Sequence, residues 1–367
     1  MIDVAISQIA RELRLAPGQV RATAGFLDAG ASVPFIARYR KEATSSLDEV
    51  AITSIRDRLS QLRELRDRRQ AILASLTERG LLTEELQQAV FSSETMTALE
   101  DVYLPYRPKR RTRATMAREK GLEPLALRLW GQQDFDVSLA AVEYVNPQLG
   151  VANGEAALSG ARDIIAEWVS EDPTARGRIR RLFWSQGTFS SRVVSGKDSA
   201  AAKYRDYFDW EEPVAEVPSH RVLAMLRGEG EALLSIRIAP PVAEAMAILE
   251  GIFVTRATEA SATEASQQVR LAVHDGYRRL LEASLETEVR KEVRVRAENA
   301  AIKVFADNLR ELLLSPALGQ RNVLALDPGF RTGCKLVCLD RQGRLLHHDT
   351  IYPLLGKRGE QEAAQKI

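Results

Sequence analysis

The 367-residue sequence has only two cysteines, Cys334 and Cys338, four histidines and no long hydrophobic run. The cysteines are four residues apart on an expected strand, about 13 Å, which is too far for a disulfide. No stretch approaches the ~20 apolar residues that cross a bilayer, and the N-terminus lacks the apolar segment of a signal peptide. These absences exclude a disulfide scaffold, indicate no membrane contact and predict a cytoplasmic chain.

The sequence also lacks a net charge and a phosphate-binding glycine loop. Its 51 basic and 50 acidic residues give a formal charge of +1, so only local clusters of charge can indicate a polyanionic partner. Neither GxGxxG nor GxxxxGK[ST] is present. The adjacent histidines His347 and His348 lie on an expected strand, where neighbours face opposite sides. We therefore expect no cofactor and no metal site.

Helical periodicity dominates the first 320 residues. Residues 52–76 place apolar side chains at intervals of three and four, and Gly80 is expected to end that helix. Thr83 is expected to cap the next helix. Asp172, followed by Pro173, has the pattern of a cap and a first-turn proline. The fold class is therefore mainly α.

Two further segments have less regular patterns. From about residue 262 to residue 314 there is no proline and one glycine, Gly276, which predicts one or two long helices. Residues 221–238 alternate around Gly228 and Gly230, which predicts a small hairpin.

The last 46 residues have the pattern of a small sheet. Residues 323–326 are apolar and end at Asp327 before a Pro-Gly turn, as expected for a buried first strand. Residues 335–339 and 344–351 predict two further strands joined by a hairpin loop. Residues 356–367 have the composition of a helix.

The first candidate site is the segment VPFIARYRKEATSSLDEV, residues 33–50. It places Arg38, Arg40 and Lys41 beside two aromatic residues, after a glycine turn and before Ser46, which is expected to cap a second helix. A short helix, a turn and a second helix with basic and aromatic residues are typical of helix-turn-helix modules that contact phosphates.

A structural alternative is open for the same segment. Phe35, Ile36 and Tyr39 would then belong to the core. The three cations would be solvated, or would pair with Glu42 and Asp48.

The second candidate is a basic run from Tyr103 to Lys120, which holds seven basic residues and one acid. Pro105 and Pro108 prevent a helix at its start, so the residues after them are expected on an exposed loop, with a helix beginning near Thr115. Such a cluster in a neutral chain is typical of a phosphate contact. The candidate contacts are Arg107, Lys109, Arg110, Arg111 and Arg113.

Two alternatives are open for this run. Tyr103 and Tyr106 either stack on bases or pack under the loop. The arginines either contact phosphates or bind acidic helices of the protein itself.

The third candidate is Asp327. An aspartate at the end of a first central strand, followed by glycine and a hairpin, is what a ribonuclease-H-like fold needs to help hold paired Mg²⁺ ions. Two metals require several converging carboxylates, and neither Asp340 nor Asp349 has an evident reason to converge with Asp327.

Four segments together resemble one family. They are VPFIARYRKEAT, DVYLPYRPKRRTRATMAREKGLEPL, ADNLRELLLSPALG and LALDPGFRTGC, and in that order they resemble the bacterial transcription accessory proteins of the Tex family. The resemblance implies an N-terminal helix-turn-helix region (1–75) and a helical scaffold (76–320) with a long helix at about 262–314. A YqgF, or ribonuclease-H-like, α/β domain follows from residue 321.

The resemblance also implies a nucleic-acid-binding role in bacterial transcription, with RNA or DNA as the partner and no enzyme activity. In the family, helix-hairpin-helix modules and an S1 domain follow the YqgF domain. Because a YqgF domain needs on the order of 100 to 150 residues, residues 321–367 are expected to be its beginning, and the chain a fragment of a longer protein. Two alternatives remain: a metal-dependent nuclease or resolvase, and a helical scaffold that binds polymerase or ribosome through protein contacts.

Overall fold

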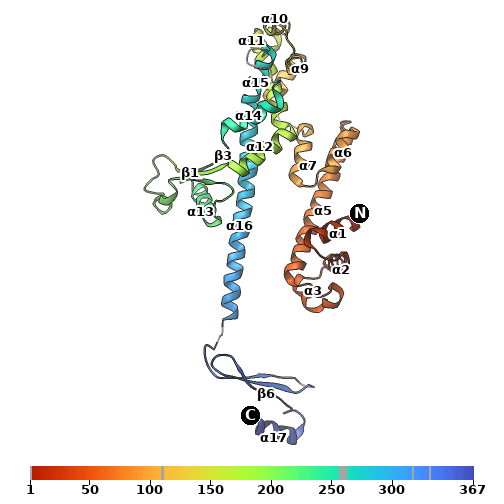
Figure 1. Cartoon of the computed structure of the whole chain (residues 1–367), viewed down its shortest axis with the longest axis vertical. Coiled ribbons are helices and arrows are strands. Elements are labelled where there is room, and N and C mark those ends of the chain that lie inside the picture. The colour runs from red at the N-terminus through yellow and green to blue at the C-terminus, as the bar shows by residue number, and fades with distance from the viewer. Residues whose placement is uncertain (1, 109–110, 256–262, 316–317, 330–331) are drawn as a thin grey trace. The chain divides into compact units, whose positions relative to one another are not determined.

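The computed structural model describes residues 2–108, 111–255, 263–315, 318–329 and 332–367. They belong to two compact units, Met1–Arg294 and Val295–Ile367. The first unit is built from helices and one small sheet, and the second from the C-terminal part of a long helix, a sheet and a further helix (Figure 1). The predicted mainly helical class is confirmed.

The first unit begins with a small helical bundle. Its helices are α1 (Ile2–Leu13), α2 (Pro17–Asp28), α3 (Val33–Tyr39), α4 (Lys41–Thr44) and α5 (Glu49–Glu78). Ile9, Ile36 and Ile52 are fully buried where α1, α2 and α3 pack on the first half of α5. The predicted cap at Ser46 is wrong, because Ser46 has φ +61° and a helix cap needs extended backbone. Asp48 caps α5 instead, accepting from the Ala51 amide at 2.8 Å.

The second half of α5 carries a separate core. The elements α6 (Glu84–Ser92), α7 (Met96–Tyr103) and the 3-10 turn η1 (Leu104–Tyr106) follow it. Ile72 and Leu76 of α5 pack with Leu99 of α7 in this core. Thr83 caps α6 as predicted, since its hydroxyl accepts from the Leu86 amide.

Helix α11 is the centre of the next part of the unit. The elements here are α8 (Arg113–Glu119), α9 (Glu123–Trp130), α10 (Val137–Val142), the 3-10 turn η2 (Pro147–Leu149), α11 (Gly154–Glu171) and α12 (Pro173–Gln186). Because Ala161, Ile165 and Val169 are fully buried, α11 packs closely on its neighbours. The predicted cap at Asp172 is confirmed by its bond from the Ala175 amide at 2.7 Å.

A three-stranded antiparallel sheet follows α12. Its elements are β1 (Thr188–Val193), the 3-10 segment η3 (Ala202–Tyr207), β2 (Asp209–Pro213), α13 (Ser219–Gly230) and β3 (Leu234–Ala239), with strand order β2-β1-β3. The predicted hairpin at residues 221–238 is wrong, because most of that segment is α13. Gly228 makes no turn there: a Cβ on it would lie 2.6 Å from the Leu234 Cδ1 atom, so the glycine allows close packing.

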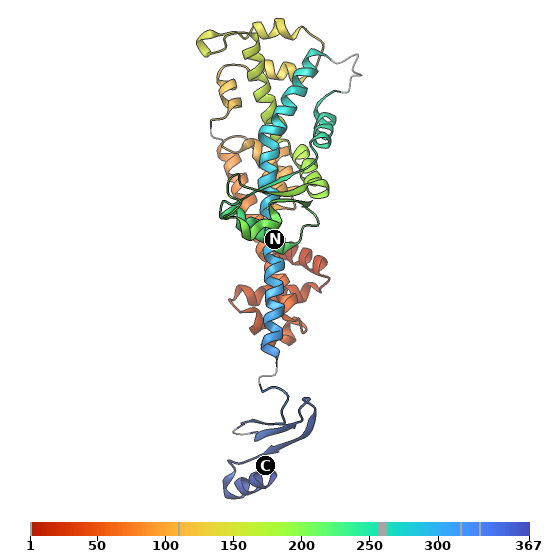
Figure 2. The same ribbon diagram turned by 90° about the vertical axis from the view of Figure 1, so that its left-hand side faces the viewer.

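Three helical segments follow, and the last of them continues from the first unit into the second, which begins at Val295. They are α14 (Val242–Phe253), α15 (Glu264–Gly276) and α16 (Glu282–Leu314), with a π-helical turn, η5 (Tyr277–Leu281), joining α15 to α16. The predicted long helix is therefore confirmed. Helix α15 lies alongside α11 (Figure 2). A Cβ on Gly276 would lie 2.9 Å from the Ala166 carbonyl oxygen, so this glycine is needed for the close approach.

Side chains of α16 cover the outer edge of strand β3. The Ile238 amide donates to Glu286 Oε1 at 2.9 Å, and Arg290 donates to the Ile236 carbonyl oxygen. Glu286 and Arg290 are four residues apart and therefore on one face of the helix. The helix thus supplies the polar partners that a fourth strand would supply.

The second unit contains an antiparallel sheet. Its elements are β4 (Val323–Asp327), β5 (Cys334–Leu339), β6 (Leu345–Ile351) and α17 (Gly356–Lys366), with strand order β4-β5-β6. The three predicted strands and the helix are confirmed, but the first strand is not buried as predicted: Leu324 and Leu326 of β4 are each 50% exposed. One detail is corrected: β5, not the strand that ends at Asp327, is the central strand of the described sheet. Leu336, Ile351 and Ala363 form its small buried centre.

Candidate nucleic-acid interface

Helix α3 presents two aromatic rings to solvent. Ser32 caps the helix by accepting from the Phe35 amide, and the helix ends at Tyr39 because Arg40 leaves helical backbone with φ −127°. Ile36 is fully buried, whereas Phe35 is 38% and Tyr39 68% exposed. The structural alternative that placed all three side chains in the core is thus right only for Ile36.

Of the three cations of this segment, Arg40 contacts an aromatic ring. The Arg40 guanidinium lies 5.0 Å from the centroid of the Phe35 ring and 5.8 Å from that of Phe26. Arg38 is 3.9 Å from the Glu49 carboxylate, and both side chains are more than half exposed, so this pair is weak. Lys41 is exposed. Because Asp48 caps α5, it is not the partner that the alternative assigned to these cations.

The start of the basic run is anchored by its tyrosines. Tyr103 is buried, and its hydroxyl lies 3.2 Å from the Ser75 hydroxyl. Tyr106 packs against the same core, and its carbonyl oxygen accepts from Arg79. Of the two alternatives, the structure therefore places these rings under the loop.

The candidate contacts of the run are distributed as follows. Arg107 is exposed and forms no ion pair among the described residues, while Lys109 and Arg110 lie outside the described residues. Arg111 is 70% exposed and lies 2.8 Å from Glu119. Arg113 is exposed, but it is the first residue of α8 and not part of a loop. The helix starts earlier than predicted because Thr112 caps it, accepting from the Thr115 amide at 3.0 Å.

The last two cations of the run bind the protein itself. Arg118 donates to the buried carboxylate of Glu167 at 2.7 Å. Burial is the strongest single influence on the pKa of Arg118 and lowers it, but the hydrogen bonds and charges of Glu167 and Glu123 together outweigh burial and raise the pKa of the guanidinium. Lys120 donates to the Gly150 carbonyl oxygen at 3.3 Å. We use the name basic loop for residues 107–112, which together with Arg113 precede these anchored cations.

Asp327 lies apart from both basic segments in the sequence. Its side chain is exposed at the end of β4, opposite Lys335 in the sheet register. Asp340 accepts from the Gln342 and Arg344 amides and stabilises the hairpin turn, and Asp349 pairs with Lys366 at 2.8 Å. Among the described residues, no three His, Cys, Asp or Glu side chains converge as metal ligands do.

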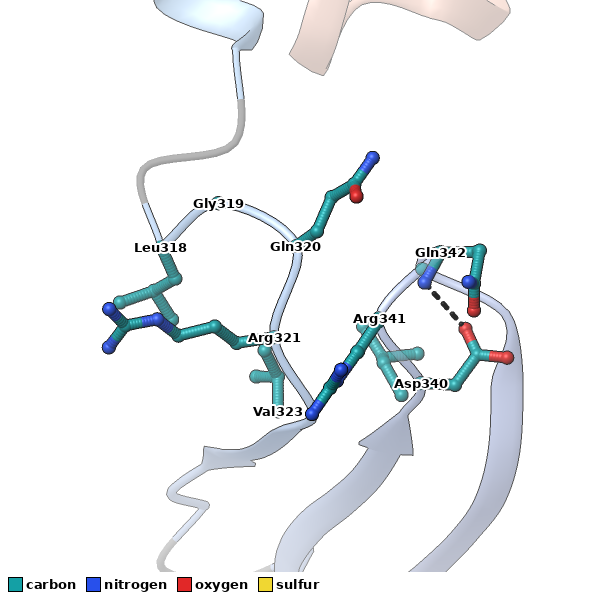
Figure 3. Close-up of a pocket in the computed structure, with 10 residues that line it drawn as sticks. Leu318, Gly319, Gln320, Arg321, Val323, Asp340, Arg341 and Gln342 are labelled. Atoms are coloured by element: carbon teal, nitrogen blue, oxygen red, sulfur yellow. Dashed lines mark hydrogen bonds between the residues drawn. The ribbon is translucent and has the colours of Figure 1, made fainter.

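An open hollow of about 430 Å³ lies beside this sheet (Figure 3). It is lined by the segment from Leu318 to Val323 and by the turn between β5 and β6. Arg321 extends away from that turn, so it does not converge with Arg341 on a common ligand (Figure 3). The hollow therefore adds no site to the two basic segments.

Comparison with known families covers most of the chain. Residues 3–77 match the Tex-like protein N-terminal domain, residues 133–305 the Tex central region-like family and residues 321–367 the Tex protein YqgF-like domain. The chain belongs to the Tex family. The resemblance carried by the four sequence motifs is confirmed.

Individual Tex-family relatives support the assignment. The chain is 44% identical over 357 residues to Protein YhgF of Escherichia coli, covering 95% of this chain and 46% of the relative. It is 42% identical over 367 residues to Protein tex of Bordetella pertussis, with 96% and 46% covered. Transcriptional accessory protein Tex of Neisseria gonorrhoeae is 39% identical over 355 residues, with 94% and 45% covered. The chain spans about half the length of these curated relatives.

The name of the Neisseria gonorrhoeae relative describes a transcriptional role, and none of the three names describes a reaction. In the part of the chain that the structure describes, no helix combines the length and apolar composition needed to cross a membrane.

Proposed function

We propose that this Tex-family chain binds nucleic acid in bacterial transcription, with the basic loop as its main phosphate contact and Arg38, Arg40 and Lys41 as a second contact. The observation that carries the proposal is that the described cations of the basic run fall into two groups, one bound to protein atoms and one exposed to solvent. Arg118 and Lys120 are bound to protein atoms. Arg107 and Arg111 extend into solvent ahead of them.

The chemistry of the loop suits a phosphate backbone. Arginine presents several donors in a fixed fork, which matches phosphate oxygens. The pair of Arg111 with Glu119 is exposed on both sides, so a phosphate can replace the carboxylate at little cost. Such contacts read no base, and they supply affinity without sequence preference.

The salt dependence of binding tests this proposal. We expect the triple variant Lys109→Ala, Arg110→Ala, Arg111→Ala to flatten the slope of log affinity against log salt by roughly two to three units, because each lost phosphate contact removes ~0.7 to 0.9. The affinity should fall about equally for every oligonucleotide sequence.

A matched control removes the same charge elsewhere. Arg56, Arg63 and Arg66 are exposed arginines of α5 that pair with aspartates. Their triple alanine variant should leave the slope nearly unchanged. An unaltered slope with a lowered melting temperature in the basic-loop variant would show that the loop binds the protein's own helices and not nucleic acid.

The two alternative functions have separate tests. For a nuclease, the described residues include no group of three or more potential metal ligands. Cleavage of nucleic acid during a Mg²⁺ titration, lost in Asp327→Asn, would be needed to support it. For a scaffold that binds polymerase or ribosome, a pull-down that survives nuclease and high salt would be needed, since apolar interfaces are weakly screened.

A further inference from the structure

The rings of Phe35 and Tyr39 form an unusual surface. Their centroids are 5.5 Å apart with an angle of 45° between the rings. Among the described residues, this is the only contacting pair of aromatic rings in which both side chains are exposed. Exposing two neighbouring rings gives up the stabilisation that their burial would provide, so the surface needs an explanation beyond folding.

The surface is held in place before any ligand arrives. The Ser32 cap and buried Ile36 fix helix α3, and the Arg40 guanidinium covers the Phe35 ring. Tyr39 has only two side-chain torsions, so ordering it on binding costs little entropy. Its 68% exposed side chain is therefore an accessible flat surface that can be ordered at low entropy cost.

Cations flank the exposed ring on the chain. Arg38 precedes Tyr39, Lys41 follows two residues later, and both are exposed. Aromatic residues and arginine are enriched at protein–protein interfaces as well, so a protein partner is the alternative that the test has to separate. A nucleotide offers both a flat base for the ring and a phosphate for the cations.

We propose that Phe35 and Tyr39 form a stacking site for unpaired nucleobases, with Arg38 and Lys41 holding the adjacent phosphates. The ligand is single-stranded nucleic acid, because bases inside a duplex are stacked on each other and offer no free face to a protein ring. This inference rests on the proposed function. It assigns single-stranded nucleic acid to the N-terminal bundle, whereas the phosphate contacts of the basic loop do not discriminate between single and double strands.

The test uses the full chain and three variants of one residue. Tyr39→Phe keeps the ring, Tyr39→Leu keeps apolar surface without a ring, and Tyr39→Ala removes both. The probes are a single-stranded oligonucleotide with one 2-aminopurine and a hairpin duplex of equal length. We expect Tyr39→Leu and Tyr39→Ala to weaken single-strand binding roughly 5- to 150-fold, and to abolish the 2-aminopurine fluorescence change that stacking causes.

Three further results are expected. Tyr39→Phe should behave like the parent chain. Duplex affinity and the salt slope should not change in any Tyr39 variant, because no phosphate contact is lost. The melting temperature should also stay unchanged, since the side chain is exposed.

Other outcomes overturn the proposal in distinguishable ways. If all Tyr39 variants bind single strands as the parent does, while the basic-loop variant still loses salt slope, the stacking site is wrong and the proposed function stands. If neither set of variants changes binding, both are wrong. Equal losses of affinity for single strand and duplex would also contradict stacking. Unchanged nucleic-acid binding would indicate that the rings bind a protein partner instead.

Discussion

Arg176 donates from Nε to Asp101 Oδ1 at 2.6 Å, and both side chains are less than one-tenth exposed. Arg180 donates to the same carboxylate at 2.7 Å, and Glu288 accepts from both arginines. The group joins α7, α12 and α16. A single carboxylate on α7 therefore holds the helix against two arginines of α12, which in turn contact α16.

Removing the charge of Asp101 should strongly destabilise the first unit. Asp101→Asn leaves two buried guanidinium groups without a carboxylate on that side, and breaking a buried pair typically costs ~3–5 kcal/mol. Urea unfolding measures this change. Asp57→Asn is the control, because Asp57 and its partner Arg56 are both more than half exposed, and its cost should stay below about 1 kcal/mol. Equal effects would show that the buried pairs are not structurally important.

Alanine substitutions at two helical glycines should change the free energy of unfolding in opposite directions. Gly276→Ala would place its Cβ against the backbone of Ala166, so we expect a loss of about 1–3 kcal/mol in the free energy of unfolding. Gly177 lies in α12 with nothing within 4 Å of an added Cβ. Gly177→Ala should therefore stabilise the chain by up to about 1 kcal/mol, because alanine favours helix. A neutral Gly276→Ala variant would contradict the close packing.

The turn between α4 and α5 stores strain that glycine should relieve. Ser45 and Ser46 both have left-handed backbone, with φ of +51° and +61°. A left-handed residue other than glycine costs about 1–2 kcal/mol, whereas glycine loses more chain entropy on folding, by about 0.5–1 kcal/mol. Ser46→Gly should therefore raise the free energy of unfolding by up to about 1 kcal/mol. Ser60→Gly, within the exposed face of α5, should lower it by about 0.5 kcal/mol, and a loss in both variants would refute the strain.

The buried hydroxyl of Tyr277 predicts a pH-dependent effect. Tyr277 is fully buried, its hydroxyl has no hydrogen-bond partner among the described residues, and burial, with nearby Glu282, raises its pKa. A raised folded pKa gives stability that is present below the unfolded value of ~10 and is lost as the pH rises toward the folded value. Tyr277→Phe removes this dependence. The stability of the variant relative to the parent should therefore increase above about pH 10.

Urea unfolding of both chains between pH 8 and 11 measures this difference. At pH 8 the variant should be as stable as the parent or more stable, since it loses a polar group that costs about 1–3 kcal/mol when buried without a partner. A clear loss at pH 8 would show that the hydroxyl has a stabilising contact.

Local signals predicted much of this fold. The caps at Thr83 and Asp172 and the uninterrupted run that became α15 and α16 depend on short-range backbone chemistry, which a sequence displays directly. Gly228 shows the limit of that approach. Its pattern resembles a turn, but the reason for the glycine is the Leu234 side chain, which only the folded chain brings near.

The candidate site was predictable in residue type but not in exposure. The basic residues of both segments were found from composition, and the prolines placed Arg107 on an expected loop ahead of Arg118. The sequence did not show that the buried Glu167 binds Arg118 while Arg107 stays exposed. The tyrosines show the same limit: Tyr103 is buried and Tyr39 is not. Burial depends on distant packing partners, so only the three-dimensional structure divides such residues between scaffold and surface.

The side chains of Glu286 and Arg290 close one of the two edges of the first sheet. Because they occupy the outer backbone groups of Ile238 and Ile236, a further strand can add only beside β2. A sheet with two open edges can add copies without end and grow into a fibre, whereas a sheet with one open edge stops after a single pairing. The long helix therefore removes one of the two edges through which this sheet could extend into a larger one.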